Sequence, residues 1–148
     1  FLPLATESIN TLQDEANKKR IKIQTAIPED ISVYADHHIL QSVIRNLLSN
    51  AIKFTPRDGN IKIEASENSK GTLISISDSG IGMDEKLLNN LFQLNVKTNR
   101  IGTENEPSTG LGLILCKEFV EKHNGKIWVE SKVNQGTTFY FNFPHTIS

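Results

Sequence analysis

Apolar residues recur along this chain with two different spacings, and each spacing predicts a different backbone conformation. A return every three or four positions predicts an amphipathic helix, because such residues share one side of a 3.6-residue turn. Asp36 and Asp84 stand where helix caps are expected, before the second and third of these segments. The helical spacing occurs at residues 4–18, 37–54, 85–92 and 111–122.

Strict alternation of apolar and polar residues instead predicts half-buried strands. It occurs at residues 21–23, 31–33, 61–65, 73–76, 126–129 and 137–141. Residues 93–108 have no periodicity, and a loop of that length inside a compact domain is usually functional or disordered. The whole pattern predicts an α/β (α+β) two-layer sandwich, in which about three helices pack on one face of a mixed five-stranded sheet.

The composition is that of one soluble globular domain. The chain has 148 residues, of which 37% are hydrophobic and 22% are charged, and its net charge is −1. This balance gives no electrostatic support for a nucleic-acid or membrane partner. No apolar run approaches the roughly 20 residues that cross a bilayer. Cys116 is expected to be a buried thiol of a cytosolic protein. Because the chain begins at Phe1 rather than Met, we expect a domain of a longer protein.

Two asparagines, Asn46 and Asn50, share one side of the predicted helix at 37–54, and Lys53 follows them closely. Two amides and an ammonium group suit a ligand that carries many oxygens and a hard metal ion. Taken alone, the pair favours side chains that face solvent or bond to nearby backbone.

The segment Asp78-Ser-Gly-Ile-Gly-Met83 follows the predicted strand at 73–76. Paired glycines let the backbone approach a flat ligand closely, and an aspartate can accept a hydrogen bond from the exocyclic amine of adenine. An unpaired acceptor costs about 1–3 kcal/mol, so Asp78 could favour adenine over guanine by roughly tenfold to a hundredfold. A plain strand-to-helix turn is the alternative.

The segment Ser108-Thr-Gly-Leu-Gly-Leu113 ends the long loop and opens a helix, whose first N–H groups suit phosphates. The alternative is a hinge with a helix cap at Ser108 or Thr109. The sequence GxxxxGK[ST] is missing, and Glu85 and Leu115 stand where GxGxxG needs its third glycine. These departures exclude a P-loop and a Rossmann nucleotide site.

Taken in order, the Asn-x-x-x-Asn helix, the DxGxGM turn, the pair Leu91–Phe92, the loop and TGLGL resemble the ATP-binding catalytic domain of sensor histidine kinases. That family belongs to the gyrase, Hsp90, histidine kinase and MutL ATPase superfamily, which has a Bergerat-type fold. The resemblance implies a single domain over 1–148, with a lead-in helix at 1–18 and an ATP lid at 93–108. It also implies ATP and Mg²⁺ as cofactors.

The resemblance gives each matching residue a role. Asn46, Asn50 and Lys53 become the expected catalytic residues; the two asparagines organise Mg²⁺ and the phosphates, with Asn50 as the better direct metal ligand. Asp78 becomes the residue that reads the adenine amine. The other expected nucleotide contacts are Phe54, Gly80, Gly82, Met83, Phe92, Thr109, Gly110, Leu111, Gly112, Leu113 and Thr137.

The lid departs from the family pattern. Ser108 stands where relatives often have glycine, and Asn95 and Lys97 stand where they often have a second phenylalanine and an arginine. We therefore interpret Lys97 and Arg100 as solvated loop cations rather than phosphate contacts.

ATP-hydrolysing relatives look to have a glutamate at the place of Asn46, where it acts as general base for water. An amide cannot take a proton at neutral pH, so the resemblance indicates a kinase with slow intrinsic hydrolysis. The histidines do not fit the family's phosphoacceptor setting, a histidine followed by an acidic residue on a long helix, and are expected to be surface or capping residues. They are His37, His38, His123 and His145.

The implied function is therefore to bind Mg–ATP and supply the γ-phosphoryl group for autophosphorylation of a histidine on a separate dimerisation/phosphoacceptor domain. Through that domain, a response-regulator receiver domain would be the next partner. The implied location is cytoplasmic, as a fragment of a bacterial sensor kinase with or without a membrane anchor. Two alternatives stay open: an anti-sigma-type protein kinase of the same superfamily, and a module that binds nucleotide without transfer.

Overall fold

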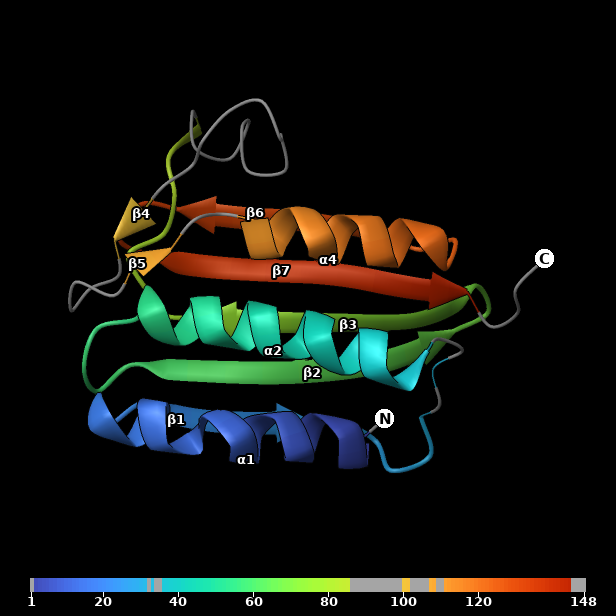
Figure 1. The fold of residues 1–148 in the computed structure, drawn as a ribbon, viewed down its shortest axis with the longest axis horizontal. Helices are drawn as coiled ribbons and strands as arrows, with labels where there is room; N and C mark the ends of the chain where they lie inside the picture. The colour runs from blue at the N-terminus through green and yellow to red at the C-terminus, as the bar shows by residue number, and fades with distance from the viewer. Residues whose placement is uncertain are drawn as a thin grey trace.

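A five-stranded sheet with helices on one face makes up most of the computed structural model, which describes residues 2–31, 33, 36–85, 100–101, 107–108 and 111–144 (Figure 1). The described helices are α1 (Leu2–Lys18), α2 (His37–Lys53) and α4 (Leu111–Lys122). The strands of the large sheet are β1 (Lys22–Ala26), β2 (Asn60–Asn68), β3 (Gly71–Asp78), β6 (Lys126–Lys132) and β7 (Gly136–Pro144). The predicted two-layer sandwich is confirmed.

The strands lie in the order β1-β2-β3-β7-β6, with β1 parallel to β2 and the other neighbours antiparallel. The sheet is therefore mixed, as predicted. The pairing of β3 with β7 places Gly71 opposite Pro144 at one end and Asp78 opposite Thr137 at the other. The end of the sheet at Asp78 thus combines the last residue of β3 with the first residues of β7.

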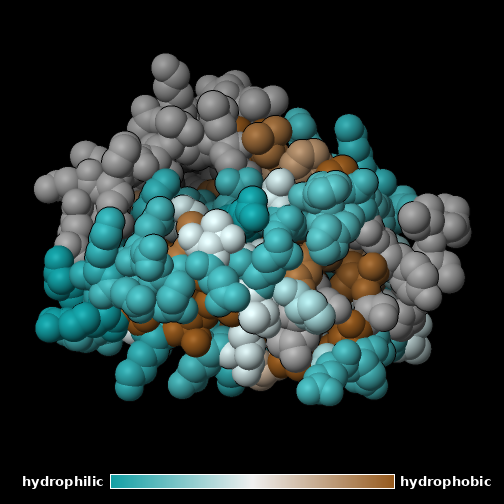
Figure 2. All heavy atoms as spheres, turned by 60° about the horizontal axis from the view of Figure 1, so that its bottom comes forward, coloured by the Kyte–Doolittle hydropathy of each residue, from teal (hydrophilic) through white to brown (hydrophobic). Residues whose placement is uncertain are grey.

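The core lies between the sheet and the helices. Alternate residues of β2, β3 and β7 point toward the helices, and α2 covers them with its apolar side. Burying one such aliphatic or aromatic side chain contributes roughly 1.5–3 kcal/mol. The outer side of the helices is polar, and Figure 2 shows a largely hydrophilic surface on the side that carries α1. The largest fully buried core side chains include Ile44, Leu47, Leu48, Ile52, Ile61, Ile63, Ile74, Ile76 and Phe141.

The other face of the sheet is not covered by the described helices (Figure 1). On this face Trp128 of β6 stacks on Tyr140 of β7, with ring centroids 5.4 Å apart and an interplanar angle of 12°. Among the described helices, none is both long and apolar enough to cross a membrane.

Asp36 caps α2, as predicted. Its Oδ1 accepts the N–H of His38 at 2.9 Å and the N–H of Ile39 at 3.1 Å. The bond from Ile39 is the largest cause that lowers the pKa of Asp36 below its ordinary value. The Asp36 N–H in turn donates to Nε2 of His123 at 3.3 Å, so His123 carries its proton on Nδ1 and donates it to the Phe119 carbonyl at 2.9 Å.

Two details differ from the sequence-based expectations. Ile31 and Val33 were expected in a strand but lie in none; Ile31 follows a turn in which its N–H donates to Pro28 O, and its side chain is buried in the core. Three alternating residues are too few to separate a strand from such a segment. Within the segment that lacks periodicity, β4 (Arg100–Ile101) pairs with β5 (Pro107–Ser108). Most of the helix expected after Asp84 and most of the lid lie outside the described residues.

Candidate nucleotide-binding site

Asn46, Asn50 and Lys53 lie along α2 and are all half-buried. Their orientation follows from the apolar side of the helix, because Leu47 and Leu48 are fully buried against the core. Turning α2 to expose the asparagines would also bring these leucines into water. The structure therefore holds the predicted asparagine pair in a fixed position at the edge of the core.

Cys116 of α4 lies against Asn46. The thiol is fully buried, donates to the carbonyl oxygen of Val43 at 3.8 Å, and lies close enough to the Asn46 side chain for that amide to influence its pKa. Burial raises the pKa of the Cys116 thiol to about 12, although the neighbouring Asn46 side chain acts in the opposite direction. The thiol is consequently neutral at physiological pH. Cys116 is the buried thiol that the sequence predicts, and its contact with Asn46 is an addition from the structure.

We expect Cys116 to resist thiol reagents while the domain is folded. At pH 8, a thiol with a pKa of about 12 has roughly a thousandth of the thiolate of a free cysteine. The rate with a small aromatic disulfide, followed by absorbance, should therefore be at least that much lower in native buffer than in urea. A native rate within about tenfold of the rate in urea would contradict this expectation and would mean that the contact between α2 and α4 opens readily.

The chain leaves α2 at Phe54, whose backbone holds the loop after β3. The Ile81 N–H donates to Phe54 O at 3.0 Å, while the Phe54 N–H donates to Asn50 O at 3.0 Å. Gly80 packs against the same carbonyl, where a Cβ would overlap Phe54 O. The asparagine helix and the Asp78–Met83 loop are thus joined through backbone atoms rather than through flexible side chains.

Asp78 ends β3 directly opposite Thr137, a buried residue of β7. The Asp78 Oδ1 accepts the Gly80 N–H at 2.9 Å, which fixes the orientation of the carboxylate. A cavity of about 520 Å³ borders this end of the sheet and is lined by both residues. A carboxylate acceptor beside a hydroxyl suits a base that carries an amine.

Ser131 of β6 contacts the Asp78–Met83 loop and Thr137 but is not among the site residues predicted from the sequence. Its hydroxyl lies 2.8 Å from the Met83 backbone nitrogen, 2.8 Å from Thr137 Oγ1 and 2.9 Å from Gly136 O. Because a carbonyl oxygen has no proton, Ser131 donates to Gly136 and accepts from Met83 and Thr137. The available signal in the sequence is a break in the alternation, since Ser131 takes the next inward position after two apolar residues of β6.

Gly82 occupies a position that does not accept a side chain. Its φ is +69°, and a Cβ would overlap the carbonyl oxygen of Lys132. The neighbouring Ile81 O accepts the Asn134 N–H at 2.8 Å. The Asp78–Met83 loop therefore contacts the end of α2 on one side and the turn between β6 and β7 on the other.

The remaining predicted contacts are only partly described. Leu111 and Gly112 start α4, as predicted, and Leu113 is buried. Among the residues that the structure describes, no group of three or more His, Cys, Asp or Glu side chains is placed to hold a metal ion. Four residues considered as contacts from the sequence lie outside the described part: Phe92, Lys97, Thr109 and Gly110.

The family model described as "Histidine kinase-, DNA gyrase B-, and HSP90-like ATPase" matches residues 35–147. The chain belongs to this family. The match includes α2, the Asp78–Met83 loop, α4 and all of β7, which are the elements that form the candidate site.

This ATPase domain is similar over nearly its full length to parts of sensor kinases. Adaptive-response sensory kinase SasA of Gloeothece citriformis (strain PCC 7424) is 38% identical over 144 residues, which are 96% of the chain and 36% of that relative. The catalytic domain of histidine kinase ThkA has a TM-score of 0.84 at 32% identity, covering 97% of the chain and 91% of ThkA's. Histidine kinase ThkA in complex with response regulator protein TrrA has a TM-score of 0.80 at 28% identity. This match covers 99% of the chain and 40% of the matched chain in that complex.

These comparisons confirm the resemblance to the ATP-binding catalytic domain of sensor histidine kinases, and with it the enzyme class of kinase. The chain spans about a third of the length of the curated relatives that it matches first.

Proposed function

We propose that this domain binds Mg–ATP and supplies the γ-phosphoryl group for autophosphorylation of a histidine on a separate dimerisation/phosphoacceptor domain. The phosphoryl group would then pass to the receiver domain of a response regulator. The complex of the relative ThkA with its response regulator TrrA supports a partner of this kind. We further propose a cytoplasmic location, with no nucleic-acid partner and no direct membrane contact.

The observation that carries the proposal is the chemistry around Asn46. Its side chain is an amide and lies beside Cys116, whose pKa of about 12 keeps the thiol neutral. Neither an amide nor a neutral thiol accepts a proton at pH 7, so neither can activate water as a general base. ATP next to this pair would be retained rather than hydrolysed quickly, which suits a kinase whose acceptor lies on another domain.

Adenine is the base that the other end of the site favours. The Asp78 carboxylate is held in one orientation by the Gly80 N–H, and Thr137 lies directly across the sheet. A preformed acceptor needs little ordering when the ligand binds, so its hydrogen bond to an amine is retained in full. Guanine has a carbonyl at that position and would leave the acceptor unpaired.

The residues of α2 fit a magnesium ion. Mg²⁺ takes oxygen ligands, keeps several waters, and usually binds through one or two protein oxygens and the phosphates of the substrate. The amide oxygens of Asn50 and Asn46 would supply those ligands. When bound, Mg²⁺ would neutralise charge on the phosphates. The Lys53 ammonium group would act on the same phosphates, together with the N–H groups at the start of α4.

A calorimetric titration with a non-hydrolysable ATP analogue and its GTP counterpart, with and without Mg²⁺, tests the proposal. We expect Mg²⁺-dependent binding that prefers adenine by roughly tenfold to a hundredfold. The Asn50→Ala variant should lose the Mg²⁺ dependence and the transfer of phosphate to a supplied phosphoacceptor domain. Arg45→Ala changes an exposed residue on another side of α2 and should leave both unchanged.

Three results would contradict the proposal in different ways. A well-folded domain that binds no nucleotide, or binds it without transfer to any acceptor, would be a non-catalytic module. Rapid, Asn50-dependent hydrolysis by the domain alone would point to an ATPase. Transfer to a serine or threonine of a partner protein, with no transfer to a histidine, would favour the anti-sigma-type kinase.

A further inference from the structure

Lys19, the residue directly after α1, places a buried ammonium group at the end of the asparagine helix. Lys19 is only 4% exposed, and its Nζ donates to the carbonyl oxygen of Ile52 at 2.8 Å and to that of Lys53 at 3.1 Å. The final carbonyls of a helix lack partners within the helix and carry its negative dipole end. A cation that bonds two of them therefore fixes where α2 ends.

A lysine in this position is not explained by packing alone. Taking an ammonium group out of water is unfavourable unless it gains charge-assisted hydrogen bonds in return. An apolar side chain of the same length would fill the space without that cost. A buried ammonium group at this position therefore requires the carbonyl groups of residues 52 and 53 to point toward it.

That geometry continues directly into the nucleotide site. The residue after Lys53 is Phe54, whose carbonyl accepts the Ile81 N–H at 3.0 Å and packs against Gly80. A change in the backbone direction at Lys53 would move the Phe54 carbonyl and release the loop. Lys19 therefore bonds the carbonyl group of Lys53, and the carbonyl group of the next residue, Phe54, holds the loop.

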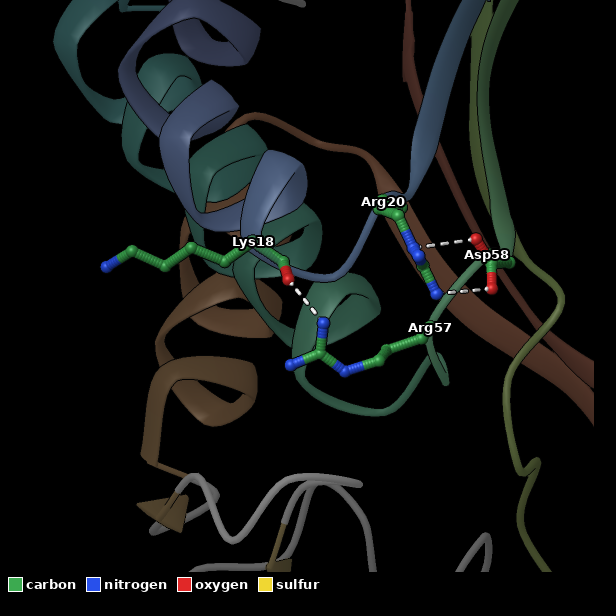
Figure 3. A network of polar contacts seen from close by, with 4 residues as sticks. All are labelled: Lys18, Arg20, Arg57 and Asp58. Carbon is green, nitrogen blue, oxygen red and sulfur yellow. Dashed lines mark hydrogen bonds and ion pairs between the residues drawn. The ribbon is translucent and has the colours of Figure 1, made fainter.

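A second set of contacts connects the same elements at the surface. Arg20 and Asp58 form a two-point ion pair, with both N–O distances at 3.0 Å, and Arg57 Nη1 donates to Lys18 O at 2.8 Å (Figure 3). The side chains of the ion pair are 67% and 65% exposed, and exposed pairs contribute little. The exposed ion pair therefore adds little to the interior contact of Lys19.

We propose that Lys19 is a positioning residue of the nucleotide site, which holds the C-terminal end of α2 so that the Phe54 carbonyl can anchor the Asp78–Met83 loop. The inference rests on the proposed function only where it concerns nucleotide affinity. Through Lys19, the position of α1 and the geometry of the site depend on each other.

The test compares Lys19→Met, which keeps the length of the side chain, with Lys19→Arg, which keeps the cation. Two quantities are measured: hydrogen exchange of the Ile81 amide without nucleotide, and the dissociation constant of the ATP analogue with Mg²⁺. Lys19→Met should speed the exchange and weaken binding by about tenfold each, and Lys19→Arg should restore most of both.

Phe143→Leu is the matched control for a general loss of stability, because Phe143 is buried at the end of β7 far from Asp78. It should lower the melting temperature and leave both quantities unchanged. Wild-type values in a folded Lys19→Met variant would overturn the proposal, as would equal effects from Phe143→Leu. If Lys19→Met fails to fold, Lys19→Gln, which keeps a neutral donor, replaces it under the same criteria. If the wild type binds no nucleotide, the proposed function fails while the Ile81 exchange still decides the role of Lys19.

Discussion

The Asp78→Asn variant should bind the ATP analogue roughly tenfold to a hundredfold more weakly than the wild type. Asparagine can still accept the Gly80 N–H with its oxygen, so the loop should keep its conformation. Its NH₂ group would then take the place of the second carboxylate oxygen and oppose the amine of adenine, donor against donor. Calorimetry with the ATP and GTP analogues should show that the preference for adenine is lost.

Ser77→Ala is the matched control for Asp78→Asn. Ser77 precedes Asp78 on β3, and its hydroxyl accepts a hydrogen bond from Thr138 at 3.1 Å on the opposite face of the sheet. This variant should bind both analogues like the wild type. Unchanged adenine preference in Asp78→Asn would mean that Asp78 serves the loop rather than the base.

The Gly82→Ala variant should lose nucleotide binding and a large part of its stability. Alanine is strained at the φ of +69°, and its Cβ would overlap the Lys132 carbonyl oxygen, which belongs to the backbone and cannot move freely. The two effects together should cost about 2–4 kcal/mol. Thermal unfolding should show a melting temperature lower by roughly 5–15 °C.

Gly125→Ala separates the loss of stability from the loss of the site. Gly125 is also buried, and a Cβ there would overlap the Asn142 carbonyl oxygen, far along β7 from Thr137. We expect a similar fall in melting temperature with normal affinity of the folded protein for the ATP analogue. If Gly82→Ala binds nucleotide normally, the contact between the loop and the β6–β7 turn has no part in the site.

Much of the fold could be predicted because its elements bury one side over many residues. The alternation in β2 and β7 extends over at least four residues each, and the helical spacing of α2 over its whole length. The cap at Asp36 has a local cause and was predicted correctly. The strand expected at Ile31–Val33 failed because burial of a short segment does not require a strand partner.

The candidate site also contains residues that the sequence could locate and residues that it could not. Asp78 and the two loop glycines lie in one short motif, so the sequence locates them directly. Ser131, Cys116 and Lys19 come from other elements, and they reach the site through the register of β6 with β7, the packing of α4 on α2, and the end of α1. Such contacts depend on tertiary pairing, which the spacing of residues along one segment does not contain.

The stack of Trp128 on Tyr140 determines what tryptophan fluorescence reports in this protein. Trp128 is the single tryptophan of the chain and lies on the uncovered face of the sheet, whereas Ser131, three residues later on the same strand, holds the Met83 N–H. Emission should therefore be insensitive to direct contact with the base. A change in emission during a nucleotide titration would instead signal that β6 itself shifts when nucleotide binds.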